Sequence, residues 1–256
     1  RNKRWYERNR ENIIQYQTWC EEWGTALFRA CCPGALVAVF NSTRTVAHVQ
    51  VALETAGFYT RDCIVYRRAS GIPKGLNLAS QLEQKGHPNA HQWDGCHSCL
   101  RNEWEAIAVL QKPLDQNYTD TVLKYGVGLF HAENGSGGFA SNIIEGIPRT
   151  GDQQVANIHC TPKPLVLMKR LVELLVPNDP DVIVADPFAG SGTTLVAAKQ
   201  LGRTYVGIEI NEEYVSLIND RLAGTQADGQ VSNARSGMHE LFPREMPSCR
   251  NPCVPG

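Results

Sequence analysis

Hydrophobic positions near the start of the chain follow a helical period and then change to a continuous run. In residues 9–30, apolar side chains recur every three or four positions, which predicts an amphipathic helix. The recurring positions are Ile13, Tyr16, Cys20, Trp23 and Leu27. Pro33-Gly34 ends this pattern, and residues 35–40 then form a short apolar run. Such a run is typical of a strand that is buried on both faces.

The same alternation continues over the first third of the chain and returns in the last third. We expect helices at residues 43–56, 165–176, 192–201 and 212–222. We expect strands at residues 58–66, 103–110, 182–185 and 204–208. Helices and strands that alternate in this way predict an α/β protein with a mostly parallel sheet and helices on both faces.

The middle of the chain breaks this regular pattern. Between about residues 70 and 158, Gly, Pro, Asn and His are frequent, and 126–138 is rich in glycine. We therefore interpret this stretch as an irregular inserted region. After residue 223 the chain is polar and rich in Pro, Gly and Ser, which indicates a tail.

Charge and hydropathy exclude two classes of protein. The 256 residues include 25 Lys and Arg against 26 Asp and Glu, for a net charge of −1. Binding to nucleic acid by bulk charge is therefore excluded, and any such contact must come from local patches. No run of about 18 apolar residues occurs, so we expect no membrane span. The first residue is Arg rather than Met, and we expect that the chain is part of a longer one.

Nine cysteines are present, and their odd number argues against a framework of disulfides. Cys20, Cys31, Cys32, Cys63 and Cys160 have apolar or helical surroundings, which favours reduced thiols and a cytoplasmic protein. The Cys96-x-x-Cys99 pair and the Cys249, Cys253 pair could supply four thiolates to a zinc ion. The looser spacing of the second pair favours unligated thiols instead, so no metal is expected.

The most informative stretch is Asp186-Pro-Phe-Ala-Gly-Ser-Gly-Thr-Thr194, which follows a predicted strand and opens a predicted helix. Gly190 and Gly192 permit a tight turn and a close approach of the backbone to a ligand. The next strand ends at Glu209, whose carboxylate can accept hydrogen bonds from both hydroxyls of a ribose.

Three nucleotide sites compete for this loop, besides an ordinary turn between strand and helix. A dinucleotide site requires a third glycine where the chain has Leu195, and a P-loop requires a lysine that is missing here. In an S-adenosylmethionine site no phosphate has to be held, and an acid at the entrance of the loop can bind the ammonium group of the cofactor. Asp186 stands at that place.

These residues carry a resemblance to a known family. DPFAGSGTT, with GIEI at residues 207–210, resembles the cofactor motif of the DNA amino-methyltransferases that make N6-methyladenine or N4-methylcytosine. Residues 159–164, His-Cys-Thr-Pro-Lys-Pro, resemble the H-x-T-x-K-P segment of that family. Weaker matches are the segments 41–45, 70–74 and 104–107, and the whole chain looks most like small phage or prophage members.

The order of the motifs resembles the permuted group of this family, in which the catalytic half precedes the cofactor half. The resemblance implies a Rossmann-like S-adenosylmethionine-dependent fold over residues 1–223. Within it, 1–69 would be the catalytic half, 70–158 the target-recognition region and 159–223 the cofactor half, with 224–256 as a flexible tail. It also implies a set of cofactor-binding residues: Lys163, Pro164, Asp186, Pro187, Phe188, Gly190, Gly192, Thr193, Thr194 and Glu209.

The catalytic loop of the family reads Asp/Asn/Ser-Pro-Pro-Tyr/Phe/Trp, and the sequence contains no such tetrapeptide. In the permuted order this loop would precede the first helix, which agrees with the expectation of a longer chain. Such a loop aligns the weakly nucleophilic exocyclic amine and stacks on a flipped base. The catalytic residues therefore remain unknown.

Several residues are weaker candidates for contact with DNA or with the target base. Tyr66 matches an aromatic near the base pocket of the family, although a packed strand tyrosine is the simpler interpretation. Arg44, Lys74, Arg67-Arg68 and the basic cluster at residues 1–10 could face phosphate groups, or be solvated. We interpret Trp19 and Trp23 as core residues rather than as stacking platforms.

The sequence therefore predicts a cytoplasmic enzyme that transfers a methyl group from S-adenosylmethionine to adenine N6 or cytosine N4 in double-stranded DNA. A homodimer is a further expectation. Two alternatives stay open: a non-catalytic DNA-binding or partner subunit that kept the fold, and a methyltransferase that acts on RNA or a small molecule. The sequence identifies neither the base, nor the recognised DNA word, nor a paired restriction enzyme.

Overall fold

A computed structural model describes residues 2–68, 75–133, 137–147 and 162–226, and the side chains from residue 9 onward. The helices are α1 (Asn2–Ala30), α2 (Val46–Thr55), α3 (Leu78–Gln84), α4 (Tyr118–Tyr125), α6 (Leu165–Leu175), α7 (Thr193–Gln200), α8 (Glu212–Ala223) and the short 3-10 helix η1 (Ala90–Trp93). The strands are β1 (Leu36–Asn41), β2 (Tyr59–Arg67), β3 (Trp104–Gln111), β4 (Ile143–Ile144), β5 (Ile183–Asp186) and β6 (Thr204–Gly207).

The strands form two sheets within the described part of the chain. The first sheet has the order β1-β3-β2-β4, and the second pairs β5 with β6 in parallel. β3 runs antiparallel to both β1 and β2, whereas β2 and β4 are parallel. β1, β2 and β4 thus share one direction, as the predicted parallel sheet requires, and β3 is the strand that departs from it.

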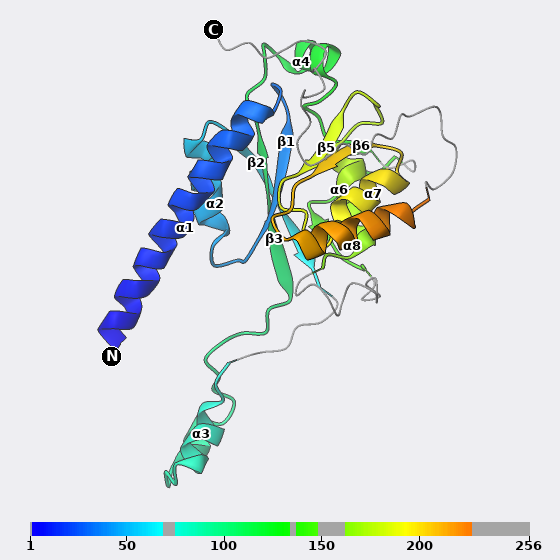
Figure 1. The fold of residues 1–256 in the computed structure, drawn as a ribbon. Helices are drawn as coiled ribbons and strands as arrows, with labels where there is room; N and C mark the ends of the chain where they lie inside the picture. The colour runs from blue at the N-terminus through cyan, green and yellow to red at the C-terminus, as the bar shows by residue number, and fades with distance from the viewer. Residues whose placement is uncertain (1, 69–74, 134–136, 148–161, 227–256) are drawn as a thin grey trace.

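Helices cover both faces of the first sheet (Figure 1). On one face, Val37, Val39, Ala108 and Leu110 pack with α1 and α2. On the other face, a second row of strand residues packs against α6: Phe40, Ile64, Tyr66, Ile107 and Val109. This alternation is the period of two that strands impose on their side chains, and it gives the sheet a separate core on each face.

Helix α6 is shared by both sheets, because it is apolar on more than one side. Leu167, Met168 and Leu171 belong to the core of the first sheet, whereas Val172 packs with Val184 of β5. Ala197 of α7 also reaches the first core, and α8 closes the second sheet through Ile218. α6 therefore joins the part of the chain before residue 148 to the part beyond residue 161.

The predicted elements of the first and last thirds are present, with shifts of a few residues at their ends. α1 starts at Asn2 rather than near residue 9, and α2 starts three residues later than predicted. The middle region was predicted as irregular, but it contains α3, α4, η1 and the short β4. The predicted tail from residue 227 onward lies outside the described residues.

The described cysteines differ in burial. Cys20 is fully buried in the core against α2, and burial raises the pKa of its thiol, whereas Cys31, Cys32 and Cys63 are half-buried. Cys160, Cys249 and Cys253 lie outside the described residues. Cys20, Cys63, Cys96 and Cys99 are free thiols. Among the described helices, none is both long and apolar enough to cross a membrane.

Candidate cofactor and DNA site

The ends of several strands meet at one edge of the molecule, which we call the carboxyl edge. β1 and β2 end there, and β3 begins there, because Asn41 pairs with Ala106 and Arg67 pairs with Trp104. In open α/β sheets, ligands bind outside the carboxyl ends of the strands. Apart from Lys163 and Pro164, the predicted cofactor residues lie at or after the ends of β5 and β6 in the second sheet.

Asp186 is the last residue of β5, and its carboxylate holds the loop that comes next. Its Oδ1 accepts a hydrogen bond from the backbone N–H of Phe188 at 3.0 Å. Its Oδ2 accepts one from the hydroxyl of Thr194, in the first turn of α7, at 2.5 Å. The loop between β5 and α7, Asp186 to Gly192, is thereby closed at both ends by one side chain, and we call it the cofactor loop.

Glu209 reaches the same loop from the end of β6. Its Oε2 accepts a hydrogen bond from the backbone N–H of Gly190 at 2.7 Å, and its Oε1 accepts one from Asn211 N–H at 3.0 Å. The backbone N–H of Ala189 donates to the carbonyl oxygen of Ile208, and the N–H of Ile208 donates to that of Asp186, which fixes the two chain segments to each other. Asp186 and Glu209 are both half-buried, and they face the cofactor loop together.

The two predicted glycines occupy conformations that favour glycine. Gly190 has a φ of +54° and Gly192 a φ of +75°. A Cβ on Gly192 would lie 2.8 Å from Cγ1 of Ile218 in α8, closer than packed carbon atoms approach. The tight turn and the packing of α7 on α8 therefore both require glycine at this position.

Not every predicted cofactor residue lies at the surface of the loop. Thr193 is 6% exposed, and its hydroxyl is within hydrogen-bond distance of Ser191 and Arg221. This arrangement favours a structural role at the start of α7. Pro187 is half-buried, whereas Phe188 is 54% exposed.

Phe188 lies against aromatic residues of α1. Its ring centroid is 5.8 Å from that of Trp19 and 5.5 Å from that of Trp23, in tilted and edge-to-face arrangements. Trp19 is 48% exposed, so the prediction that it is a core residue is wrong, whereas Trp23 does pack against the core below α2. α1 and the cofactor loop therefore share an aromatic cluster at this end of the molecule.

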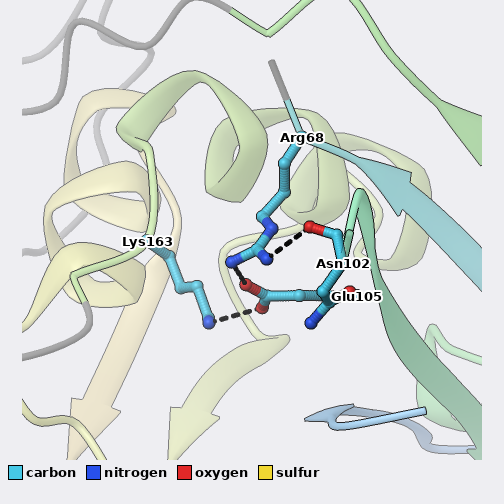
Figure 2. A network of polar contacts seen from close by, with 4 residues as sticks. All are labelled: Arg68, Asn102, Glu105 and Lys163. Atoms are coloured by element: carbon cyan, nitrogen blue, oxygen red, sulfur yellow. Dashed lines mark hydrogen bonds and ion pairs between the residues drawn. The ribbon is translucent and has the colours of Figure 1, made fainter. Parts of the chain in front are cut away.

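Lys163 and Pro164 stand directly before α6, with Pro164 as its N-cap. Figure 2 shows Lys163 directed toward Glu105 at the start of β3, with its Nζ 2.7 Å from Oε2. The same Nζ lies 5.0 Å from the ring centroid of Phe40. The predicted pocket lysine is thus held by a half-buried carboxylate. The rest of the 159–164 motif, His159 to Thr161, lies outside the described residues.

The weaker DNA candidates have different positions. Tyr66 is 6% exposed beneath α6, and burial, followed by the negative charge of Glu105, raises the pKa of its phenol. Its burial favours the packed alternative over stacking on a base. Arg44 is exposed in the turn after β1, and Lys74 lies outside the described residues.

Two arginines at the end of β2 pair with carboxylates. Arg67 pairs with Glu145 at the surface, and Arg68 pairs with Glu105. Sequence reasoning missed Glu105, although one signal was present. It stands two residues before Ile107 in a run that is otherwise apolar, on the face that the core of α6 covers.

A shallow groove of about 520 Å³ lies away from the cofactor loop. Val65, Arg67, Trp104, Ile143 and Glu145 are among the residues that line it. None of its lining residues belongs to the cofactor loop, so we do not assign it to the cofactor. Among the described residues, no group of three or more His, Cys, Asp or Glu side chains could hold a metal ion, and Cys249 and Cys253 lie outside them.

Comparison with known proteins places the chain in a family. Residues 1–220 match the DNA methylase family N6_N4_Mtase. The Type II methyltransferase M.HindIII of Haemophilus influenzae is 32% identical over 228 residues, which cover 85% of this chain and 72% of that protein. The Type II methyltransferase M.HinfI, also of Haemophilus influenzae, is 23% identical over 216 residues. This match covers 82% of the chain and about half of that relative, 52%.

Solved structures agree with this family. The crystal structure of an M1.HpyAVI–SAM complex is 24% identical, with a TM-score of 0.57 over 79% of this chain and 81% of that chain. Likeness at this identity shows the fold, which confirms the predicted α/β methyltransferase architecture. The neighbour contains the cofactor that the motifs predict. With 220 of its residues matched, this chain belongs to the N6_N4 DNA methylase family.

Proposed function

We propose that this chain binds S-adenosylmethionine at the cofactor loop and takes part in methyl transfer to an exocyclic amine of adenine or cytosine in double-stranded DNA. One observation carries the proposal: Asp186 and Glu209, from the ends of two neighbouring parallel strands, close on the same glycine-containing loop. Family membership supports the reaction, and the geometry of the loop supports the position proposed for the cofactor.

The residues at the loop fit this cofactor chemically. An ionised carboxylate can accept about four hydrogen bonds, and Asp186 and Glu209 each accept two from the protein. Both groups therefore keep capacity to accept from an ammonium group and from ribose hydroxyls. The exposed ring of Phe188 offers an apolar face beside them. When bound, the cofactor supplies a methyl group on a positively charged sulfur.

DNA would approach the carboxyl edge, because two parts of the molecule project there. Residues 75–103 connect the end of β2 to the start of β3 and extend away from both sheets as a separate module (Figure 1). The beginning of α1 extends past the first sheet on the same side. We propose that this module belongs to the target-recognition region, residues 70–158, and that exposed Arg10 and Arg44 face phosphate groups.

The proposed role of the described residues is placement. An exocyclic amine is a poor nucleophile, and its methylation depends on alignment with the donor and on local electrostatics. No residue of the sequence matches the family's catalytic tetrapeptide, so we assign no catalytic residue. The cofactor half would hold the methyl donor, and the target base would lie against the first sheet.

Titration calorimetry with S-adenosylhomocysteine, the demethylated product, tests the cofactor site in the full chain. We expect Asp186→Ala and Glu209→Gln each to weaken binding about tenfold or more, because each loses a charged hydrogen-bonding partner. Glu212→Gln removes an exposed carboxylate three residues beyond Glu209 and should bind as the wild type does. Absence of binding by the wild type would refute the proposed site.

The substrate is tested separately, by the transfer of labelled methyl groups to duplex DNA, single-stranded DNA and RNA. Methylated adenine or cytosine in duplex DNA, identified by nucleoside mass spectrometry, is the expected product. Labelling of RNA alone would support the alternative substrate. Cofactor binding without transfer to any of the three would support the non-catalytic partner.

Two further predictions, one about the oligomeric state and one about the location in the cell, come from the sequence. We propose a homodimer, which light scattering on the purified chain can check directly. We also propose a cytoplasmic location, on the basis of the reduced cysteines, and fluorescence imaging of a tagged full gene product can check it.

A further inference from the structure

Glu105 lies where the two halves of the molecule meet at the carboxyl edge. Its Oε2 is 2.7 Å from Nζ of Lys163, and its Oε1 is 3.3 Å from NH1 of Arg68 (Figure 2). Arg68 directly follows β2 of the first sheet. Lys163 directly precedes Pro164 and α6, in the part of the chain that carries the cofactor loop. One carboxylate thus bridges cations from two parts of the chain that are far apart in sequence.

The position of Glu105 results from the register of β3. Side chains alternate along a strand, so Glu105 shares the face of Ile107 and Val109, which pack beneath α6. Glu105 is the last member of this row at the carboxyl edge, opposite Tyr66 of β2. It therefore meets the chain at the point where α6 begins.

Because the three side chains are partly buried, their electrostatic interaction is stronger than that of an ordinary exposed ion pair. The side chains of Glu105, Lys163 and Arg68 are 22%, 27% and 32% exposed. Ion pairs in such surroundings are screened less by water and salt than exposed pairs are. Removal of one partner also leaves the other charges without compensation.

Arg68 holds the carboxylate in a fixed orientation. Its NH2 donates a hydrogen bond to the carbonyl oxygen of Asn102 at 2.9 Å (Figure 2), and its backbone N–H donates to the carbonyl of Glu103 at 2.7 Å. Arg68 is thus fixed to the chain just before β3. The second oxygen of Glu105 is in turn directed at Lys163.

Lys163 matters because α6 begins only two residues after it. This helix packs on the first sheet through Leu167 and Leu171, and it is in contact with α7. α7 begins where the cofactor loop ends. A displacement at the start of α6 would therefore change the placement of the cofactor loop relative to the first sheet.

We propose that Glu105 is a positioning residue, which clamps the start of α6 to the carboxyl edge through Lys163 and so aligns the cofactor half with the first sheet. The clamp itself stands on the contacts above. Only its consequence for methyl transfer rests on the proposed function.

Hydrogen–deuterium exchange of the full chain tests the clamp without any ligand. Glu105→Gln keeps the shape of the side chain and removes its charge. We expect amides in the first turns of α6, such as that of Met168, which bonds to Pro164, to exchange about tenfold faster. Glu145→Gln is the matched control, because it removes the carboxylate of the 61% exposed Arg67 pair at the same edge. Unchanged exchange in Glu105→Gln would overturn the proposal.

A double-mutant cycle separates clamping from general destabilisation. If Glu105 acts through Lys163, the change to Gln should add little once Lys163→Met has been made. Exchange rates that rise in Glu105→Gln/Lys163→Met by the product of the two single effects would contradict the clamp. Exchange that rises equally throughout the molecule would contradict it as well.

Kinetics and binding then test alignment. We expect Glu105→Gln to lower kcat for duplex DNA about tenfold, while the KM for S-adenosylmethionine and the affinity for S-adenosylhomocysteine stay within about twofold. A loss of cofactor affinity with normal kcat would overturn the alignment role. If the wild type binds no cofactor, the proposed function fails, and the exchange experiment still decides whether the clamp exists.

Discussion

At Gly192 the lack of a side chain lets the cofactor loop enter α7 while α8 packs against it. A Cβ there would meet Cγ1 and Cγ2 of Ile218 at 2.8 and 3.1 Å, and the φ of +75° adds backbone strain. We expect Gly192→Ala to lower the free energy of unfolding by about 2–4 kcal/mol, measured by urea denaturation.

A second glycine supplies the control for this prediction. Gly202 has a φ of +65°, but nothing lies within 4 Å of the position of a Cβ. Gly202→Ala should therefore show the backbone strain alone, about 1 kcal/mol. Equal losses of unfolding free energy in the two variants would show that the contact with Ile218 does not contribute to the effect of Gly192→Ala.

Single residues were predictable where backbone geometry or charge leaves few alternatives. The two glycines and Asp186 lie in the turn between strand and helix that the sequence predicts, and Glu209 follows the next strand, whereas their binding of the cofactor stays a prediction. The burial of Thr193 was not predictable, because it depends on Arg221, which lies 28 residues later and approaches only when α8 folds back. Lys163 was identified, but its partner Glu105 was not, because strand register had to bring the two residues together.

At the scale of elements, Gln111 at the end of β3 bonds to three other segments of the chain. It is fully buried, and its Nε2 donates to the carbonyl oxygens of Gly34 and Gly128 at 2.8 and 2.9 Å. Its Oε1 accepts from the hydroxyl of Tyr59 and from the guanidinium of Arg61. Without the amide, the carbonyl oxygens of Gly34 and Gly128 and the side chains of Tyr59 and Arg61 would all lose these hydrogen bonds.

We therefore expect Gln111→Met to destabilise the protein by about 2–4 kcal/mol, because a side chain of similar size leaves buried donors and acceptors unsatisfied. Thermal and urea denaturation would measure the loss. Gln116→Met, the same change at an exposed position, should stay within about 0.5 kcal/mol of the wild type. A loss below about 1 kcal/mol at Gln111 would argue against this network.

Elements with a clear apolar pattern were predicted, including the four-residue strands β5 and β6, whereas α4 and β4 were not. α4 has eight residues, and its caps were readable in the sequence. The side chain of Asn117 accepts from the N–H of Asp120, and Gly126 ends the helix in the left-handed conformation. β4 has two residues and gives no pattern at all. It forms because Ile143 and Ile144 lie beside Val65 and Tyr66.

At the scale of the molecule, residues 75–103 are nearly independent of the body. Ala79 and Ala90 are the buried residues of this module. Arg67 and Trp104, on either side of it, are register partners, so a short linker can join the two strands. The body therefore needs this module little for its own stability.

Replacement of residues 70–101 by a short Gly-Ser linker should leave a folded body that unfolds within about 1 kcal/mol of the wild type and still binds S-adenosylhomocysteine. Discrimination among duplexes of different sequence should be lost, as a binding assay on a panel of oligonucleotides would show. Retained discrimination would contradict the proposed recognition role, and loss of cooperative unfolding would contradict the independence of the module.

The fold class was predictable because alternating helices and strands leave few arrangements. The order of the strands was not, since nothing local states that β3 lies between β1 and β2. That placement is a property of the whole chain, set by the two cores that only a central β3 can complete.

The place of β3 also has a consequence for synthesis on the ribosome. β1 and β2 are synthesised before their partners, because β1 pairs with β3, and β2 pairs with β3 and β4. Until Gln111 has left the exit tunnel, the edges of β1 and β2 that β3 will cover have no strand partner. We expect the nascent chain to be most exposed to aggregation and to chaperones during this interval, and to become protected once the central strand inserts.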